Sequence, residues 1–490
     1  MTTALAEVQP LKMHFPPVKL ILDPHKMEDA YSMAVVGQIF RGLLRYSPKG
    51  DVLPDLAESW EESKDHLRYR FKLKAAKFSD GTPITAKNVQ ISFARMFHLG
   101  ASMGADLDYI QGTKAFRTSK NLSQLGIRVI SDQVVEFELS HPSALFLKHL
   151  AVVDSSILPV HDFKDELTLT AKGAYSGPYR VIDIPDAEHL VVEKWRKDAL
   201  DSLRPPARVV YWTTDKVPEA LALAGETDTL DHDRLTTLSV KDGLLKQGWI
   251  ATPTEVTGET FLVLHPDMIP LDTRRYLYSK INPNELLKTL GQTPYRPAFG
   301  VIPSWIPGEL TENEAKPIRA AAAGAVSPSG KIALDYEKGN PLEEKIADFL
   351  KNVWQTDRFK VELSGLTKSE KLKRLFGGTS PVCLGRKGLD YPDAFSVLGY
   401  FRSGYDSNYF HVNDAKIDEE LGMASALLDK KQREAKYREV QISVLKQFTV
   451  IPLFFGSEAS GLWSPKVKEV PAHPMGYHTL PVESIEMAKE

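Results

Sequence analysis

Residues 67–74 alternate strictly between apolar and basic side chains, and this alternation limits what the segment can become. In order they are Leu67, Arg68, Tyr69, Arg70, Phe71, Lys72, Leu73 and Lys74. Because successive side chains of a β-strand point to opposite faces, a period of two predicts a strand with one buried face and one basic, solvent-exposed face. Such a strand needs a second layer of structure over its apolar face.

A turn and a helix are predicted directly after this strand. Residues 79–83, Ser-Asp-Gly-Thr-Pro, predict a turn, because glycine tolerates a positive φ and proline presets the next φ. Thr85 then predicts a helix N-cap. Four apolar residues follow on one helical face: Val89, Phe93, Met96 and Phe97. Residues 135–139 predict another one-sided strand, so strands and helices interleave and the sequence predicts mixed α/β layers.

The later parts of the chain are less uniform. Residues 178–195 predict two short strands around a turn, and residues 450–455 predict a fully buried strand. The brief apolar run at 261–264 predicts a connection between lobes. Residues 294–330 contain six prolines, so the sequence predicts mostly loop there.

Length and charge exclude several classes of protein. A chain of 490 residues is expected to form more than one domain, since domains hold roughly 100–200 residues. The formal net charge of −3 predicts no binding of nucleic acid and no basic membrane patch. No apolar run approaches the roughly 18 residues of a membrane span. The single cysteine, Cys383, excludes an internal disulfide and is predicted to be a small buried side chain.

The motifs of catalysis and metal binding are missing from the sequence. It contains neither a His-Glu-x-x-His helix nor a Gly-x-Ser-x-Gly turn. Residues 324–331 resemble a phosphate loop but have one residue too many between the glycines. Residues 231–233, Asp-His-Asp, come nearest to a metal cluster, yet adjacent residues seldom converge on one ion. The sequence therefore predicts a protein that is not an enzyme and that uses no metal and no cofactor.

Eight short motifs match a known family in their order along the chain. They lie at residues 22–28, 40–44, 54–60, 78–86, 176–179, 390–393, 413–418 and 451–453. The series closely resembles the family 5 extracellular solute-binding proteins of ABC importers. The first motif, Leu-Asp-Pro-His-Lys-x-Glu, most resembles the oligopeptide-binding members of that family.

The resemblance implies a fold and a function. The fold is a bilobal α/β fold of the periplasmic-binding-protein type II class (cluster C), with two hinged lobes and an extra inserted domain. Lobe I would comprise residues 1–45, 173–258 and 459–490, domain II residues 46–172, and lobe III residues 259–458. The protein would be a monomeric, periplasmic or cell-surface receptor that encloses an extended oligopeptide and delivers it to an ABC permease in the inner membrane.

The same resemblance assigns ligand-binding residues. Asp390 matches a buried carboxylate that pairs with the α-ammonium of the peptide; the alternative is an ordinary turn aspartate. Glu28 matches a position that lines the cleft, and Ala30 and Tyr391 are further candidates. Other matching residues are expected to be structural, namely Asp23, Asp55, Trp60, Asp80 and Gly81.

Arg386 and Lys387 depart from the family pattern just before Asp390. Relatives usually have an aromatic and a small residue there. If these cations point inward, they would repel a ligand ammonium or pair with a ligand carboxylate, which arginine binds in a bidentate manner. Both are therefore included among the candidate ligand-binding residues.

Two alternative functions stay open at this point. The scaffold also serves proteins that bind nickel complexes, heme or oligosaccharides, so the solute need not be a peptide. A cytosolic solute-sensing module is the other alternative, but such regulators carry a DNA-binding domain ahead of the first motif. Residues 4–6, Ala-Leu-Ala, resemble the end of an export signal, and we expect the natural gene to encode such a signal upstream.

Overall fold

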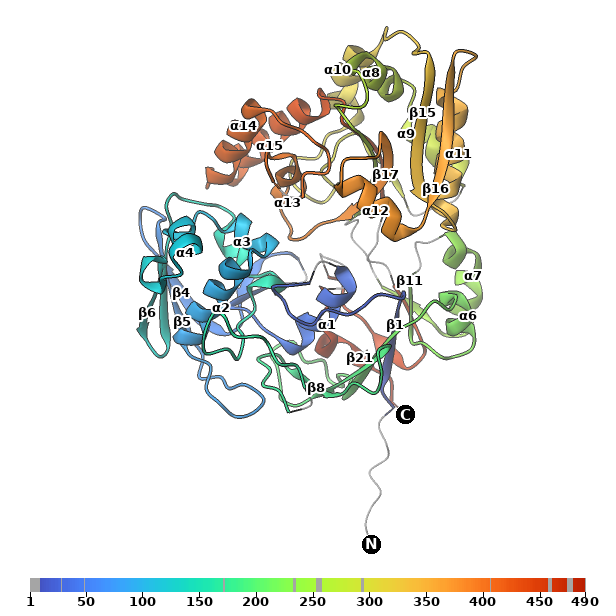
Figure 1. Cartoon of the computed structure of the whole chain (residues 1–490). Helices are drawn as coiled ribbons and strands as arrows, with labels where there is room; N and C mark the ends of the chain where they lie inside the picture. The colour runs from blue at the N-terminus through green and yellow to red at the C-terminus, as the bar shows by residue number, and fades with distance from the viewer. Residues whose placement is uncertain are drawn as a thin grey trace. The chain divides into compact units, whose positions relative to one another are not determined.

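The structure, a computed structural model of the chain, is drawn in Figure 1. It describes residues 9–27, 29–47, 49–170, 172–231, 235–252, 258–291, 295–405, 407–456, 461–473 and 479–489. The chain divides into two compact units. Unit 1 comprises residues 1–232, 240–254 and 460–490, and unit 2 comprises residues 233–239 and 255–459. Each unit mixes helices with sheets, which confirms the predicted α/β class.

The first sheet of unit 1 has four strands. Across the sheet they are β1 (Leu11–Phe15), β10 (Arg208–Thr213), β9 (His189–Lys194) and β8 (Tyr179–Asp183). Strand β1 pairs with β10 in parallel, and the other pairs are antiparallel. The hairpin β8–β9 confirms the two strands predicted within residues 178–195. Helix α1 (Ala30–Ile39) contacts β8, and the small pair β2 (Leu44–Tyr46) and β3 (Val52–Pro54) follows it in the chain.

The second sheet of unit 1 contains the alternating strand. Its order is β4 (Ala57–Glu62), β5 (Arg68–Leu73), β7 (Val134–Glu138) and β6 (Ile127–Ser131). In β5 the residues Tyr69, Phe71 and Leu73 are buried and the intervening basic residues are exposed. Helix α2 (Ala86–Leu99) contacts β6 and β7. The predicted strand, N-cap and buried helix face are therefore all confirmed, and the short helices α3 (Ser102–Asp106), α4 (Thr113–Ser119) and α5 (Phe146–His149) complete this part.

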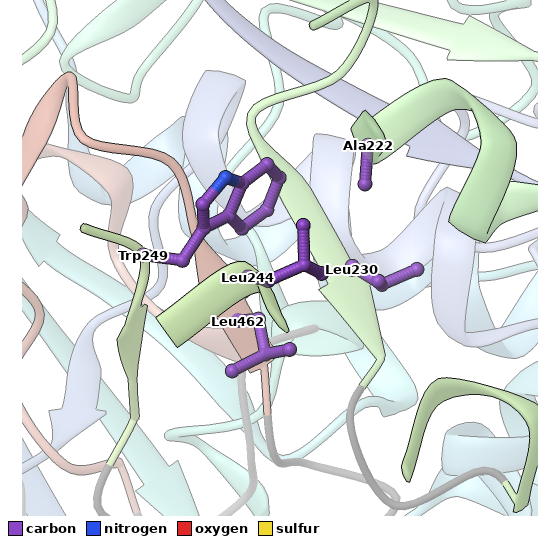
Figure 2. Packing of buried hydrophobic residues seen from close by; sticks show 5 residues of the cluster. All are labelled: Ala222, Leu230, Leu244, Trp249 and Leu462. Carbon is purple, nitrogen blue, oxygen red and sulfur yellow. The ribbon is translucent and has the colours of Figure 1, made fainter. Parts of the chain in front are cut away.

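A third, three-stranded sheet of unit 1 has an apolar cluster beside it. Its order is β11 (Thr229–Asp231), β19 (Gly461–Trp463) and β12 (Ile250–Ala251). Figure 2 shows five buried side chains packed together there: Ala222, Leu230, Leu244, Trp249 and Leu462. They come from helices α6 (Pro218–Leu223) and α7 (Leu235–Lys246), from β11 and β19, and from the residue before β12. Segments far apart in the sequence are thus held in one small core. Elsewhere in unit 1, β20 (Val467–Glu469) and β21 (Glu486–Met487) form a further strand pair.

The Leu-Asp-Pro-His motif ties the start of the chain to helix α2. Arg95 of α2 is 1 % exposed, and its Nη1 and Nη2 donate to the two oxygens of Asp23 at 2.9 and 2.6 Å. Arg95 Nη1 also lies 3.0 Å from His25 Nδ1. Because arginine only donates, the imidazole nitrogen must be the acceptor. The structural role predicted for Asp23 is therefore to neutralise a buried guanidinium.

Another buried arginine connects both ends of the chain. The Arg41 guanidinium donates to Glu483 and lies 3.5 Å from Asp55, with Arg41 Nε and Asp55 Oδ2 as the two atoms. Burial raises the pKa of Asp55 to about 6, although Arg41 opposes this shift. Asp55 is thus a structural residue, as predicted.

Gly177 of the Ser-Gly-Pro-Tyr motif sits where a side chain has no room, so we expect Gly177→Ala to destabilise unit 1. A Cβ at this position would lie 2.6 Å from the backbone carbon of Ile39. Backbone must shift to accept it, which typically costs about 1–3 kcal/mol. Urea unfolding measures the loss. The control is Gly243→Ala in α7, where a Cβ meets nothing within 4 Å and where alanine stabilises a helix by roughly 0.5–1 kcal/mol. Equal effects of the two substitutions would contradict this prediction.

Unit 2 is built on one six-stranded sheet. Its order is β14 (Arg296–Pro297), β18 (Val450–Gly456), β13 (Gly258–Leu264), β17 (Val382–Gly388), β15 (Gly330–Glu337) and β16 (Phe359–Leu366). Strand β13 is antiparallel to β17 and β18, and β15 is parallel to β16 and β17. The helices are α8 (Leu271–Ser279), α9 (Pro283–Leu290), α10 (Glu312–Ala322), α11 (Pro341–Trp354), α12 (Lys368–Phe376), α13 (Phe395–Leu398), α14 (Ala415–Ala426) and α15 (Lys430–Leu445). Every residue of β18 is buried, as predicted.

One prediction for unit 2 was wrong and another was confirmed. Residues 261–264 are not a connection between lobes, because they belong to β13, a central strand of the sheet whose residues are all buried. Residues 294–330 are mostly loop, as predicted, but they also contain α10, which forms in spite of Pro317. Thr311 and Glu314 form a capping box at its start, and this pairing satisfies two N–H groups that the first turn leaves open.

Candidate ligand-binding site

Three neighbouring strands of unit 2 carry paired glycines at one end. Gly258 opens β13 and is paired with Gly388 at the end of β17 and with Gly456 at the end of β18. The chain passes between the units at 232/233, 239/240, 254/255 and 459/460. The last two passages are only a few residues along the chain from Gly258 and Gly456, and the loop that follows β17 begins after Gly388, the pairing partner of Gly258.

That loop carries Asp390, whose carboxylate already has a cationic partner. The Asp390 backbone N–H donates to Ser396 Oγ at 2.7 Å, which holds the loop against α13. Lys387 Nζ donates to Asp390 Oδ1 at 2.8 Å and to Oδ2 at 3.0 Å. The Tyr400 hydroxyl donates to Oδ2 at 3.0 Å. Lys387, one of the two cations that depart from the family pattern, therefore points toward Asp390, the residue predicted to bind the peptide ammonium.

A column of aromatic rings packs between this charged pair and the sheet. The Lys387 ammonium lies 4.4 Å from the centre of the Tyr400 ring, whose π-face attracts a cation. The Tyr400 ring packs on Tyr409 at 5.7 Å, and Tyr409 stacks on Phe261 of β13 at 6.1 Å between ring centres. Phe261 has room because its partner on β17 is Gly385, where a Cβ would lie 2.5 Å from Phe261 Cε2.

Burial and mutual attraction set the charges of the pair. Burial by itself lowers the pKa of Lys387, but the Asp390 carboxylate, its hydrogen bond and the nearby Tyr409 together outweigh burial, and the pKa is raised. The ammonium is therefore charged at neutral pH. The Lys387 side chain is 22 % exposed and that of Asp390 is 33 % exposed, so solvent reaches both groups. Together they present a strong dipole but no net charge.

A second carboxyl group, Glu259, lies on the same face of β13 as Phe261. Glu259 is 3 % exposed, and its Oε1 has no hydrogen-bond partner among the residues that the structure describes. Burial raises the pKa of Glu259 well above its ordinary value. Burial therefore favours the neutral carboxylic acid, a form that can donate as well as accept a hydrogen bond.

The other predicted site residues lie in different surroundings. Tyr391 follows Asp390 in unit 2, and its side chain is buried. Arg386 is exposed on β17, where its backbone pairs with Thr260. Ala30 is an exposed residue of unit 1 at the start of α1, directly after the N-cap Asp29. Glu28 lies outside the described residues.

Sequence reasoning missed the aromatic column and Glu259. Aromatic residues are dense in 400–410, with Tyr400, Phe401, Tyr405, Tyr409 and Phe410, and that density was an available signal. Glu259 was also visible, as the one charged residue at the start of an apolar strand. Cys383, in contrast, behaves as predicted: it is buried, and burial raises the pKa of its thiol to about 12.

Within the described ranges, no three His, Cys, Asp or Glu side chains come together in a way that could hold a metal ion. In the same part of the chain, none of the helices combines the length and the apolar character needed to cross a membrane.

Comparison with known proteins decides the family. The model of the family described as "Bacterial extracellular solute-binding proteins, family 5 Middle" matches residues 51–409, well over half of the chain. The chain belongs to this family. This confirms the resemblance inferred from the eight motifs, and the family is one of solute-binding proteins.

Relatives of this family 5 protein cover nearly its whole length. The periplasmic oligopeptide-binding protein OppA of Escherichia coli (strain K12) is 25% identical over 474 residues, covering 89% of this chain and 84% of that protein. The dipeptide-binding protein DppE of Bacillus subtilis (strain 168) is 24% identical, covering 90% and 86%.

Solved structures confirm the fold. The murein tripeptide binding protein MppA of Escherichia coli superposes with a TM-score of 0.82 at 21% identity, covering 100% of both chains. Haemophilus influenzae OppA, solved in complex with RPPGFSPFR, gives 0.79 at 19% identity, covering 98% of this chain and 99% of that one. The family 5 protein therefore has the multidomain α/β fold of these solute-binding proteins, as predicted.

Proposed function

We propose that this protein is the extracytoplasmic peptide receptor of an ABC importer, a binding protein and not an enzyme. It encloses a short, extended peptide and delivers it to a permease in the membrane. The observation that carries this proposal is the likeness over nearly the full chain to relatives named for oligopeptide and dipeptide binding. Support also comes from the fold of an OppA solved with a peptide.

We propose the predicted three-part division for this receptor: lobe I at 1–45, 173–258 and 459–490, domain II at 46–172, and lobe III at 259–458. The outline of unit 2, at 255–459, supports the limits of lobe III. The lobes would exchange between open and closed states, and a ligand would favour the closed state by its higher affinity for it. The receptor acts as a monomer, and it is exported through a signal encoded upstream.

The ligand-facing charges are proposed to come from the end of β17 and the loop after it. Asp390, Lys387 and Arg386 supply them, and Tyr391 supports the loop from its buried position. Glu28 and Ala30 complete the proposed set from the other part of the chain. Main-chain pairing with the peptide would supply affinity without regard to its side chains.

Peptide binding can be tested on the purified protein with a library of random tetrapeptides. Retained peptides are identified by native mass spectrometry, and closure is followed as a fall in the radius of gyration by small-angle scattering. At a peptide concentration of 100 times Kd, the free energy of unfolding should rise by about 2.7 kcal/mol. A library that leaves thermal stability and mass unchanged would contradict peptide binding. Binding without any change in radius would contradict closure alone.

A further inference from the structure

We propose that the peptides taken up by this protein have a blocked amino terminus, such as an N-acyl group, because Lys387 of the protein itself supplies the ammonium at Asp390. The inference rests on the proposed function and narrows its ligand class. An ordinary peptide would bring its own α-ammonium to this carboxylate, which was the expectation from family resemblance.

Asp390 has little hydrogen-bonding capacity left to offer a cation. A carboxylate has about four acceptor positions. Lys387 Nζ uses one on each oxygen, at 2.8 and 3.0 Å, and the Tyr400 hydroxyl uses another on Oδ2 at 3.0 Å. The charge of Asp390 is also neutralised, so no net attraction for an ammonium remains.

Lys387 is held in place from two sides. Its Nζ contacts Asp390 on one side and lies 4.4 Å from the centre of the Tyr400 ring on the other. Tyr400 is itself packed on Tyr409, which stacks on Phe261 of the central strand. Moving Lys387 aside would expose the ring to solvent and leave Asp390 without its partner.

Glu259 adds little attraction for a ligand ammonium. It lies on the face of β13 that carries Phe261 and is 3 % exposed, and burial raises its pKa well above the ordinary value, which favours the uncharged acid. An ammonium arriving at Asp390 would therefore meet the ammonium of Lys387 with little help from Glu259.

A blocked amino terminus fits the groups that remain. Lys387 has three N–H donors, and two of them are used by Asp390. The third can donate to the carbonyl oxygen of an acyl group on the peptide nitrogen. Such a ligand offers a hydrogen-bond acceptor and carries no charge at its amino end. This suits the Lys387–Asp390 ion pair, whose net charge is zero.

The test uses two synthetic libraries of random tetrapeptides at equal concentration, one with free amino termini and one N-acetylated. The protein is freed of bound ligand, mixed with both libraries and washed, and the retained peptides are quantified by mass spectrometry. We expect the acetylated peptides to be retained in about tenfold excess or more. A preference for free amines would overturn the inference. If neither library is retained, the proposed function fails, and the inference fails with it.

Variants link the preference to Lys387. Lys387→Met leaves Asp390 without its cationic partner, so the excess of acetylated over free peptides should fall by about tenfold or reverse in favour of free amines. Lys416→Met is the matched control, since Lys416 is an exposed lysine of the same unit, and the ratio should stay as in the unmodified protein. If Lys387→Met does not fold, the double variant Lys387→Met, Asp390→Asn carries the test. With both charges gone, its ratio should approach one. A ratio unchanged in these Lys387 variants would overturn the inference.

Discussion

Replacing Arg95 by methionine is expected to lower the free energy of unfolding of unit 1 by about 3–5 kcal/mol. Arg95 is 1 % exposed and makes a bidentate ion pair with Asp23, and its Nε donates to the carbonyl of Asp165 at 2.9 Å. Removing one partner of a buried ion pair leaves the other charge without compensation, which is the reason for the large cost. Urea unfolding followed by circular dichroism measures the loss.

Two further variants make this prediction specific. Arg128→Met removes an exposed arginine that pairs with Glu138 on the same unit, and exposed pairs contribute at most about 1 kcal/mol. The double variant Arg95→Met, Asp23→Asn leaves no buried charge and should recover part of the stability. A loss below about 1 kcal/mol for Arg95→Met would contradict the role assigned to the Leu-Asp-Pro-His motif.

His25 is expected to make the protein acid-sensitive, with a loss of roughly 2–3 kcal/mol between pH 6.5 and pH 4.5. Burial, and next the charge of Arg95, lower the pKa of His25 from 6.5 to about 3. Below pH 6.5 the unfolded chain takes up a proton at His25. The folded chain does not take up this proton until the pH falls to about 3. The unfolded state then binds more protons, so the free energy of unfolding falls as the pH falls. This contribution is fully present above pH 6.5.

The variant His25→Gln isolates that contribution from the other titrating groups. Glutamine offers an acceptor oxygen toward Arg95 but takes up no proton, so its stability should depend less on pH. The difference in unfolding free energy between the two proteins, measured from pH 7 to pH 4.5, should shrink as the pH falls. A difference that is constant over this range would mean that His25 takes up its proton equally in the folded and the unfolded protein.

Local patterns predicted the regular elements well, and tertiary context decided the exceptions. The period of two in β5 and the helical face of α2 appear as predicted, because each pattern matches the face that is buried. The apolar run at 261–264 is too short to show whether it crosses between lobes or lies in a sheet. Its strand identity follows from partners on β17 and β18, which lie far away in the sequence. Pro317 argues against a helix, and α10 nevertheless forms around it and buries Ala315, Ile318 and Ala322.

The site was predictable in composition but not in arrangement. Family motifs located Asp390, and the departure at Arg386 and Lys387 was visible in the sequence. Which way Lys387 points depends on Tyr400, which is thirteen residues further along and contributes both a ring and a hydroxyl. No local pattern encodes that contact. The raised pKa of Glu259 could not be predicted from the sequence either, because it follows from burial within a sheet and not from its neighbours in the chain.

The pairing of Gly258 with Gly456 brings together the two ends of residues 258–456, a cassette that holds the six-stranded sheet of unit 2. Its two ends lie on neighbouring strands, so the cassette can be cut out of the gene, or inserted into a surface loop of another protein, without pulling its ends apart. A fragment spanning 255–459 would carry the entire six-stranded sheet together with Lys387, Asp390 and Tyr400. At less than half the mass of the receptor, an isotope-labelled fragment would let nuclear magnetic resonance follow the Lys387 ammonium directly.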